Sequence, residues 1–327
     1  MDFRHLKQED IDQLVKYNER VFPERRGFVD RYFTFLFAKN KDEQYLSLVI
    51  DDASRIRGQI IYSSMSYFYQ GTKTNSFWSF DLIVDESLRK EVYGLDFMQY
   101  YSRQYKSTFA TGSGPVALKL HLALGSKWMG EIRKYVGIFN VWGVPTSVCR
   151  GVVPVCKFPN MIVVGETSFV RCVADEVEWA EHPYNEELWE PCRDNEYMRW
   201  RFSNKLHEYA IYKDANSDNY FVLRTIVKKG ITAVVLVDFR CNLQQKHELS
   251  VILQAIKKIM RKMWLAILIC GSSHANIDKQ LERAYMKSIG RPRPIIGKIH
   301  YKDRKSDIDN RQFALVTLAD SDGETLW

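Results

Sequence analysis

The order of hydrophobic patterns along the chain constrains its fold more than any other feature. In the first half, strand and helix patterns alternate in this order: strands at 45–50, 56–69 and 77–84, a helix at 95–106, a strand at 108–111 and a helix at 116–125. The second half repeats the order with a hairpin at 220–238, an amphipathic helix at 248–263, a strand at 265–269 and a helix at 277–289. This alternation predicts an α/β fold that occurs twice.

Prolines and glycines cluster between the two halves, at residues 140–170. Such residues interrupt regular structure, so we place the domain boundary there. The predicted organisation is an N-terminal domain at 1–145, a connector at 146–170 and a C-terminal domain at 171–327. A chain of 327 residues is long enough for two domains of ordinary size.

The composition is that of a folded protein with a small positive charge. Hydrophobic residues make up 46% and charged residues 27%, which excludes a disordered chain. There are 47 Lys and Arg against 40 Asp and Glu, giving a net charge of +7. That charge permits an anionic ligand, but it is too small to predict nucleic acid as a partner.

The apolar runs of the chain are short. The two longest, at 233–237 and 264–270, have the length of strands, whereas a membrane span needs about 18 residues or more. The N-terminus has charges throughout and no apolar leader pattern. We therefore expect a cytoplasmic protein with no membrane partner. The seven histidines form no cluster with metal-ligand spacing, so no metal is expected.

A turn after the strand pattern at 77–84 is the most informative part of the sequence. The strand ends at Val84, a helix begins near Leu95, and Arg89 and Gly94 lie between them. A strand-to-helix turn directs backbone N–H groups and the positive end of the helix at one point, which suits a phosphate group. Glycine allows the backbone to approach such a ligand closely.

This turn resembles the coenzyme A pyrophosphate loop of the GNAT N-acetyltransferase superfamily. The family pattern is Arg/Gln-x-x-Gly-x-Gly/Ala; Arg89 and Gly94 match its first and last positions, and Val92 replaces the central glycine. The resemblance implies two tandem GNAT-like domains, each a mixed, mostly antiparallel sheet flanked by helices. It also implies that coenzyme A or acetyl-CoA binds at Leu82, Ile83, Val84, Arg89, Lys90, Glu91, Val92, Tyr93, Gly94 and Leu95.

A second match lies on the next helix. The family often shows Asn-x-x-Ala-x-x-Leu-Tyr-x-x-Leu-Gly, and residues 114–125 match at Ala117, Leu120, Leu124 and Gly125. His121 stands where the family has the tyrosine that often acts as general acid. The resemblance implies that His121 protonates the leaving thiolate; a structural histidine is the alternative. Asp81 is the candidate general base, acting on the amine through water, with a structural role as the alternative.

The resemblance implies an acyl-CoA-dependent N-acyltransferase, with acetyl as the expected acyl group. The acceptor would be an amine on a small molecule, sugar or peptide. Two alternatives stay open. One is a degenerate, non-catalytic GNAT-like binding or assembly module, favoured by Val92 and by the lack of a cofactor motif in the second half. The other is a Fem-like aminoacyl transferase. The oligomeric state is left open.

Overall fold

The computed structural model describes residues 1–38, 47–53, 55–89, 93–148, 150–204, 206–298 and 314–320. The chain forms two compact units that do not follow the chain order. Unit 1 contains Met1–Ser66, Thr74–Met129 and residues 294–298, and unit 2 contains Tyr67–Lys73, Gly130–Arg293 and residues 314–320. The domain boundaries expected at residues 145 and 171 stay a prediction.

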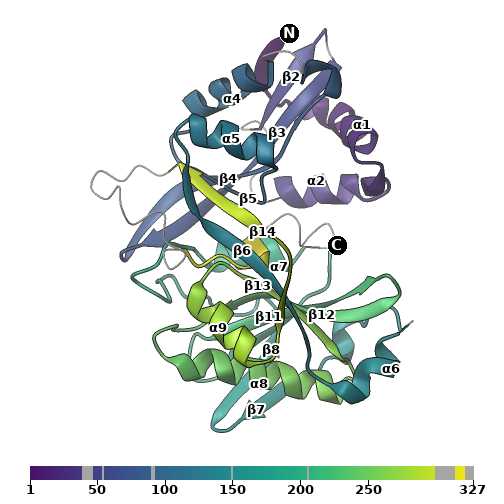
Figure 1. The fold of residues 1–327 in the computed structure, drawn as a ribbon, viewed down its shortest axis with the longest axis vertical. Helices are drawn as coiled ribbons and strands as arrows, with labels where there is room; N and C mark the ends of the chain where they lie inside the picture. Colours follow the sequence, from purple (N-terminus) through teal and green to yellow (C-terminus); the bar gives the residue numbers. More distant parts are fainter. Residues whose placement is uncertain are drawn as a thin grey trace. The chain divides into compact units, whose positions relative to one another are not determined.

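Unit 1 is a mostly antiparallel sheet with helices on both faces (Figure 1). Its strands lie in the order β1 (Asp2–His5), β2 (Leu48–Asp52), β3 (Arg55–Tyr69), β4 (Thr72–Val84), β5 (Thr108–Thr111) and the end of β14 (Lys287–Lys298). The pair of β4 and β5 is parallel, whereas β5 and β14 are antiparallel. The helices are α1 (Ile11–Val21), α2 (Val29–Phe37), α4 (Tyr93–Gln104) and α5 (Pro115–Ala123), with short 3-10 turns at Gln8–Asp10, Pro23–Arg25 and Glu86–Leu88.

The alternation of side chains along β3 decides which helix covers which face of this sheet. Ile60 and Tyr62 pack in one core cluster with Phe97 of α4. Gln59 points to the other face, where the amide of Asn18 on α1 donates to it over 2.7 Å. Because successive side chains of a strand point to opposite faces, α1 and α4 cover opposite faces of the sheet.

Unit 2 has a larger sheet. Its strands lie in the order β14, β6 (Lys127–Ile138), β13 (Ile267–Ser272), β12 (Ile231–Arg240), β11 (Tyr220–Lys228), β10 (Ala210–Asp214), β8 (Thr167–Cys172) and β7 (Met161–Val164). A short strand, β9 (Glu190–Pro191), pairs with Tyr67 and Phe68 of β3. The helices are α6 (Val144–Ser147), α7 (Asn195–Phe202), α8 (Lys246–Lys262) and α9 (Ala275–Arg283), with 3-10 turns at Val141–Gly143, Val155–Lys157 and Leu318–Asp320.

The strongest sequence patterns of the second half are confirmed. The hairpin predicted at 220–238 is β11 and β12, joined by Lys229 and Gly230, both with positive φ as tight hairpin turns require. The helix predicted at 248–263 is α8, and its apolar stripe, including Leu249, Ile252 and Ile256, is buried in the core. The strand that follows begins at Ile267, two residues later than predicted.

The same order of elements occurs in both units: hairpin, helix, parallel strand, helix. It is β3, β4, α4, β5 and α5 in unit 1, and β11, β12, α8, β13 and α9 in unit 2. The strand that follows each series pairs with a strand of the other series. β6 follows α5 and pairs with β13, and β14 follows α9 and pairs with β5. The predicted α/β fold with a mostly antiparallel sheet is therefore confirmed, and the superposition of two tandem copies stays a prediction.

Candidate functional site

The parallel strands β4 and β5 of unit 1 pair over a short stretch and then diverge. Among the described residues they form two pairs, Phe77 with Thr108 and Trp78 with Phe109. β4 continues to Val84, and at Asp81 its backbone has a φ of 44°. A positive φ is uncommon for a residue other than glycine and bends the strand. The edge of β4 beyond Trp78 is therefore open on the side of β5.

The end of β4 shows which peptide groups face this open edge. The N–H of Asp85 donates to the carbonyl of Arg57 on β3 over 2.8 Å. In a strand the N–H and C=O of one residue face the same edge and those of the next residue face the opposite edge, so the N–H and C=O of Val84 face away from β3. Arg89 Nε donates to the Val84 carbonyl over 2.9 Å. The predicted ligand Arg89 is thus an exposed side chain anchored at the mouth of the open edge.

Asp85 begins the turn and holds it in place. Its carboxylate accepts hydrogen bonds from the backbone and hydroxyl of Ser87 and pairs with Arg57 and Arg20 at 3.1 and 3.0 Å. Burial raises the pKa of Asp85, but the hydrogen bonds from Ser87 and the two arginine charges lower it more, so the pKa lies below its ordinary value. Asp85 is therefore an ionised turn cap beside a group of arginines.

The predicted cofactor loop continues from Arg89 into the first turn of α4, and the structure describes only part of it. Lys90, Glu91 and Val92 lie outside the described residues, and Tyr93, Gly94 and Leu95 form the first turn of α4. A Cβ on Gly94 would meet no atom of the described residues within 4 Å, and its φ is ordinary. The packing of the described residues does not require glycine at this position, so the space beside its backbone is available to a ligand.

Asp81, the candidate base, forms a buried ion pair. Arg25 donates to both of its carboxylate oxygens, over 2.7 and 3.0 Å, and the two side chains are 4% and 8% exposed. Arg25 also lies 4.0 Å from the ring centroid of Phe22. Both carboxylate oxygens of Asp81 are thus engaged by one guanidinium in a bidentate pair. The catalytic role of Asp81 stays a prediction, and the ion pair gives it a structural role.

His121 lies in the core of unit 1, where α5 contacts α4. It is 4% exposed, and its ring stands perpendicular to that of Tyr101, with 6.0 Å between the centroids. Burial lowers the pKa of His121 to about 4. The imidazole is therefore neutral at pH 7, a form that gives up its remaining proton reluctantly. The role of general acid stays a prediction that this environment does not favour.

Sequence reasoning missed Tyr101 on α4. Burial raises its pKa to about 12, an effect that the side chains of Thr108 and Ser79 partly offset. These two neighbours lie on β5 and β4, close to the point where the strands diverge. Tyr101 therefore carries a protonated hydroxyl at that point. Only its spacing on the helix pattern was visible in the sequence, and that spacing equally fits a core residue.

Unit 2 closes the corresponding turn with its own side chains. The N–H of Asn242, just after β12, donates to Glu248 over 2.7 Å, and the N–H of Leu243 donates to Asn185 over 2.8 Å. The paired stretch of β12 with β13 is longer, running from Ala233 to Leu236. Donors that a ligand would use are therefore already bound.

A network of buried charges lies beside this turn. Asp238 accepts from Arg193 and Arg240 over 2.7 and 2.9 Å and from the hydroxyls of Tyr220 and Thr317 over 2.7 and 2.6 Å. Burial raises the pKa of Asp238, but the charges of Arg193 and Arg240 lower it well below its ordinary value. This network ties four distant parts of the chain together and gives unit 2 a polar core.

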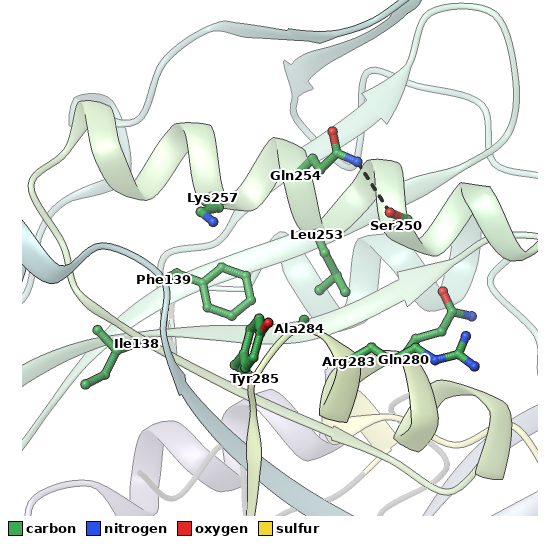
Figure 2. Close-up of a pocket in the computed structure, with 10 residues that line it drawn as sticks. All are labelled: Ile138, Phe139, Ser250, Leu253, Gln254, Lys257, Gln280, Arg283, Ala284 and Tyr285. Atoms are coloured by element: carbon green, nitrogen blue, oxygen red, sulfur yellow. Dashed lines mark hydrogen bonds between the residues drawn. The ribbon is translucent and has the colours of Figure 1, made fainter.

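Unit 2 also contains a pocket of about 460 Å³ between α8, α9 and the end of β6. Figure 2 shows Phe139, Leu253 and Tyr285 facing one another across it. Lys257 and Arg283 contribute cations, and no carboxylate or histidine lines it among the described residues. The pocket suits an apolar molecule with a negative group, but it lacks a residue that would accept a proton near neutral pH.

The described ranges contain no group of three or more His, Cys, Asp and Glu side chains placed to hold a metal ion. In the same ranges, no helix combines the length and apolarity needed to cross a bilayer.

Comparison with solved structures identifies the fold. A GCN5-related N-acetyltransferase from Anabaena variabilis matches 90% of this chain and 72% of its own length, with a TM-score of 0.63 and 10% identity. A probable N-acyltransferase from Enterococcus faecalis matches 90% and 71%, with a TM-score of 0.60 and 10% identity. The Saccharomyces cerevisiae N-myristoyltransferase, solved with bound myristoyl-CoA, matches 90% and 77%, with a TM-score of 0.55 and 9% identity.

The chain therefore has the GNAT fold, as its motifs predicted. At such identities the likeness concerns the fold and not the activity. No family model and no curated protein sequence matches this chain.

Proposed function

We propose that this protein is an acyl-CoA-dependent N-acyltransferase with its coenzyme A site in unit 1. The observation that carries the proposal is the divergence of β4 and β5 beyond Trp78, which leaves an open strand edge next to a glycine-containing turn. The GNAT fold, shared with structures of N-acetyl- and N-myristoyltransferases, supports it. The corresponding turn of unit 2 is closed by its own side chains, so unit 1 would hold the cofactor.

The residues of the open edge fit coenzyme A. Gly94 leaves space beside the first turn of α4, where backbone N–H groups and the helix dipole favour a pyrophosphate. Arg89 lies at the mouth, and Arg20 and Arg57 add positive charge behind Asp85. Acyl-CoA would supply an activated acyl group as a thioester.

The chain's own part in the reaction is orientation and stabilisation of charge. The peptide N–H of Val84 faces the open edge and would donate to a carbonyl oxygen placed there, stabilising its developing negative charge. The hydroxyl of Tyr101, still protonated at pH 7, is a donor near the start of that edge. The acceptor amine would attack in its neutral form. An acetyl group and an amine on a small molecule, sugar or peptide are the proposed substrates.

A second candidate function has its own support. His121 is buried and neutral, and both carboxylate oxygens of Asp81 are occupied by Arg25. These observations favour a non-catalytic member that uses the GNAT fold to bind a partner. Coenzyme A binding separates the two candidates, since a retained cofactor site without a reaction would be unexpected.

The test is a thermal unfolding titration with coenzyme A and acetyl-CoA. A ligand that binds only the folded state stabilises it by RT ln(1 + [L]/Kd), about 2.7 kcal/mol at about 100 times Kd. Gly94→Trp should abolish the shift by filling the space beside α4, whereas Gln104→Trp, exposed at the other end of the same helix, should leave it unchanged. No shift at millimolar coenzyme A would contradict the proposal.

A further inference from the structure

An exposed apolar surface lies at one corner of unit 2, where three segments of the chain meet. Its two aromatic members, Trp142 and Trp264, are 81% and 57% exposed. Such exposure is unusual, because large apolar groups gather on a protein surface mainly where something binds. We call this the corner surface, and its exposed members are Val141, Trp142, Val148, Val152, Ile231 and Trp264.

Close backbone contacts bring the three segments together. A Cβ on Gly143 would lie only 2.7 Å from the carbonyl carbon of Leu265, so the residues next to the two tryptophans are in contact. Val148 forms a β-bridge with Ile231, which directly follows the turn of the β11–β12 hairpin. The exposed apolar residues therefore form one surface, although they are spread over more than a hundred residues of the chain.

Cations predominate around the corner surface, although the exposed Glu208 lines a small pocket together with its member Val152. The segments 132–165, 219–237 and 249–277, which build it, contain no Asp or Glu. Arg150 donates to the carbonyls of Met263 and Trp264 over 2.5 and 3.3 Å, which places its guanidinium beside the backbone of Trp264. The exposed cations of these segments include Arg150, Lys228, Lys229, Lys258, Arg261 and Lys262.

We propose that the corner surface docks unit 2 onto an anionic lipid bilayer. Tryptophan prefers the headgroup level of a membrane, and nearby Lys and Arg are attracted to anionic lipids. A second copy of the chain fits less well. A two-fold contact through this surface would bring its cations against the same cations of the partner, and these cations outnumber the nearby Glu208.

This proposal is independent of the acyltransferase proposal and compatible with the absence of a spanning helix in the described ranges. The length of the apolar runs in the sequence indicates only whether a segment can span a membrane. It does not detect a folded surface that binds a membrane. A surface built from Val141, Trp142 and Trp264 is discontinuous in sequence, and binds from one side.

The experiment is co-sedimentation of the full chain with vesicles of phosphatidylcholine, with and without phosphatidylglycerol. We expect binding to the mixed vesicles at least tenfold stronger than to phosphatidylcholine alone, and weaker binding as salt rises. No binding to the mixed vesicles, or equal binding to both, would overturn the proposal.

Matched variants locate the binding surface. Trp142→Ala and Trp264→Asn should each lower partitioning roughly tenfold, since each removes a large apolar group. Asparagine is chosen at position 264 because the backbone there has a φ of 53°, which asparagine tolerates. Arg261→Ala and Lys262→Ala should each lower it about fivefold. Lys279→Ala, an exposed lysine of α9 outside these segments, should change nothing.

Two results would show that the corner surface does not bind a membrane. If light scattering shows a dimer that Trp142→Ala converts to a monomer, the surface belongs to a second copy and the membrane proposal fails. Equal vesicle binding by wild type and both tryptophan variants, all with unchanged melting temperatures, would also overturn it.

Discussion

Each unit has one pair of parallel strands in the same order of elements, but the edge beside the pair is open in unit 1 and the turn beside the pair is closed in unit 2. In unit 1, β4 and β5 pair at two positions and then diverge, next to a turn that contains Gly94. In unit 2, β12 and β13 pair at four positions, and Glu248 and Asn185 accept the N–H groups of the turn after β12. One order of elements thus produces an edge open to a ligand in one unit and a closed, internally satisfied structure in the other.

The two units also use buried charge differently. The fully buried carboxylate of Asp238 in unit 2 is held by Arg193, Arg240 and two hydroxyls. The ion pair of Asp81 and Arg25 in unit 1 lies where β4 bends. The first arrangement joins distant segments, whereas the second accompanies the bend that opens the strand edge. Four experiments test this contrast, in order of expected effect.

The largest effect is expected at Asp238. Asp238→Asn leaves Arg193 and Arg240 buried without their shared carboxylate, and removing one partner of a buried pair costs about 3–5 kcal/mol. Urea denaturation measures the loss. Asp218→Asn, which breaks a half-exposed pair with His182 and Lys213, is the control and should cost less than about 1 kcal/mol. Equal effects of the two changes would show that the buried network does not stabilise unit 2.

The second effect concerns pH and His121. The unfolded chain takes up a proton on this histidine near pH 6.5, but the folded protein does so only near pH 4. Stability is therefore full above pH 6.5 and falls by about 3 kcal/mol as the pH drops to 4. His121→Gln should remove this part of the pH dependence of unfolding. If the variant keeps the wild-type slope, the imidazole titrates normally and the general-acid role regains support.

The third effect is on the affinity for coenzyme A. Arg89→Ala removes a cation from the mouth of the open edge and should weaken binding about tenfold, or about 1.4 kcal/mol, in calorimetric titration. Arg103→Ala, exposed in the last turn of α4, is the matched control and should bind like wild type. Unchanged affinity of Arg89→Ala for coenzyme A would show that Arg89 does not bind the anion and that other groups of the turn do.

The smallest effect tests the closed turn of unit 2. Glu248→Ala removes the acceptor of the Asn242 N–H at the start of α8 and should cost about 1 kcal/mol in urea denaturation. It should leave coenzyme A binding unchanged, because the ligand is expected in unit 1 alone. A second equivalent of bound coenzyme A in this variant would mean that Glu248 blocks a functional second site.

Sequence periodicity predicted the local elements well where the patterns were strong. Helix α8 and the β11–β12 hairpin follow directly from the spacing of Leu249, Ile252 and Ile256 and from the Lys229-Gly230 turn. The family motifs predicted the GNAT fold from a few positions, among them Arg89, Gly94 and Gly125. Local interactions set these features, so a local stretch of sequence is enough to show them.

Site roles were less visible in the sequence. Residue type and strand position predict Asp81, and the family resemblance predicts His121, but the pairing of Asp81 with Arg25 and the burial of His121 against Tyr101 are not visible in the sequence. Both partners come from other elements of the fold. A motif predicts where a residue lies in the fold, but it does not determine the charges or the burial around that residue.

By itself, the sequence determined the order of strands and helices, the turn that suits a phosphate and the class of fold. Only the tertiary structure decided that β14 pairs with β5 and β6 with β13, that Asp238 lies among buried arginines, and that Gly143, next to Trp142, packs against Leu265, next to Trp264. The reason is physical: hydrogen-bonding patterns and hydrophobic periodicity act over a few residues, whereas pairing partners, burial and charge environments arise between residues far apart in the chain.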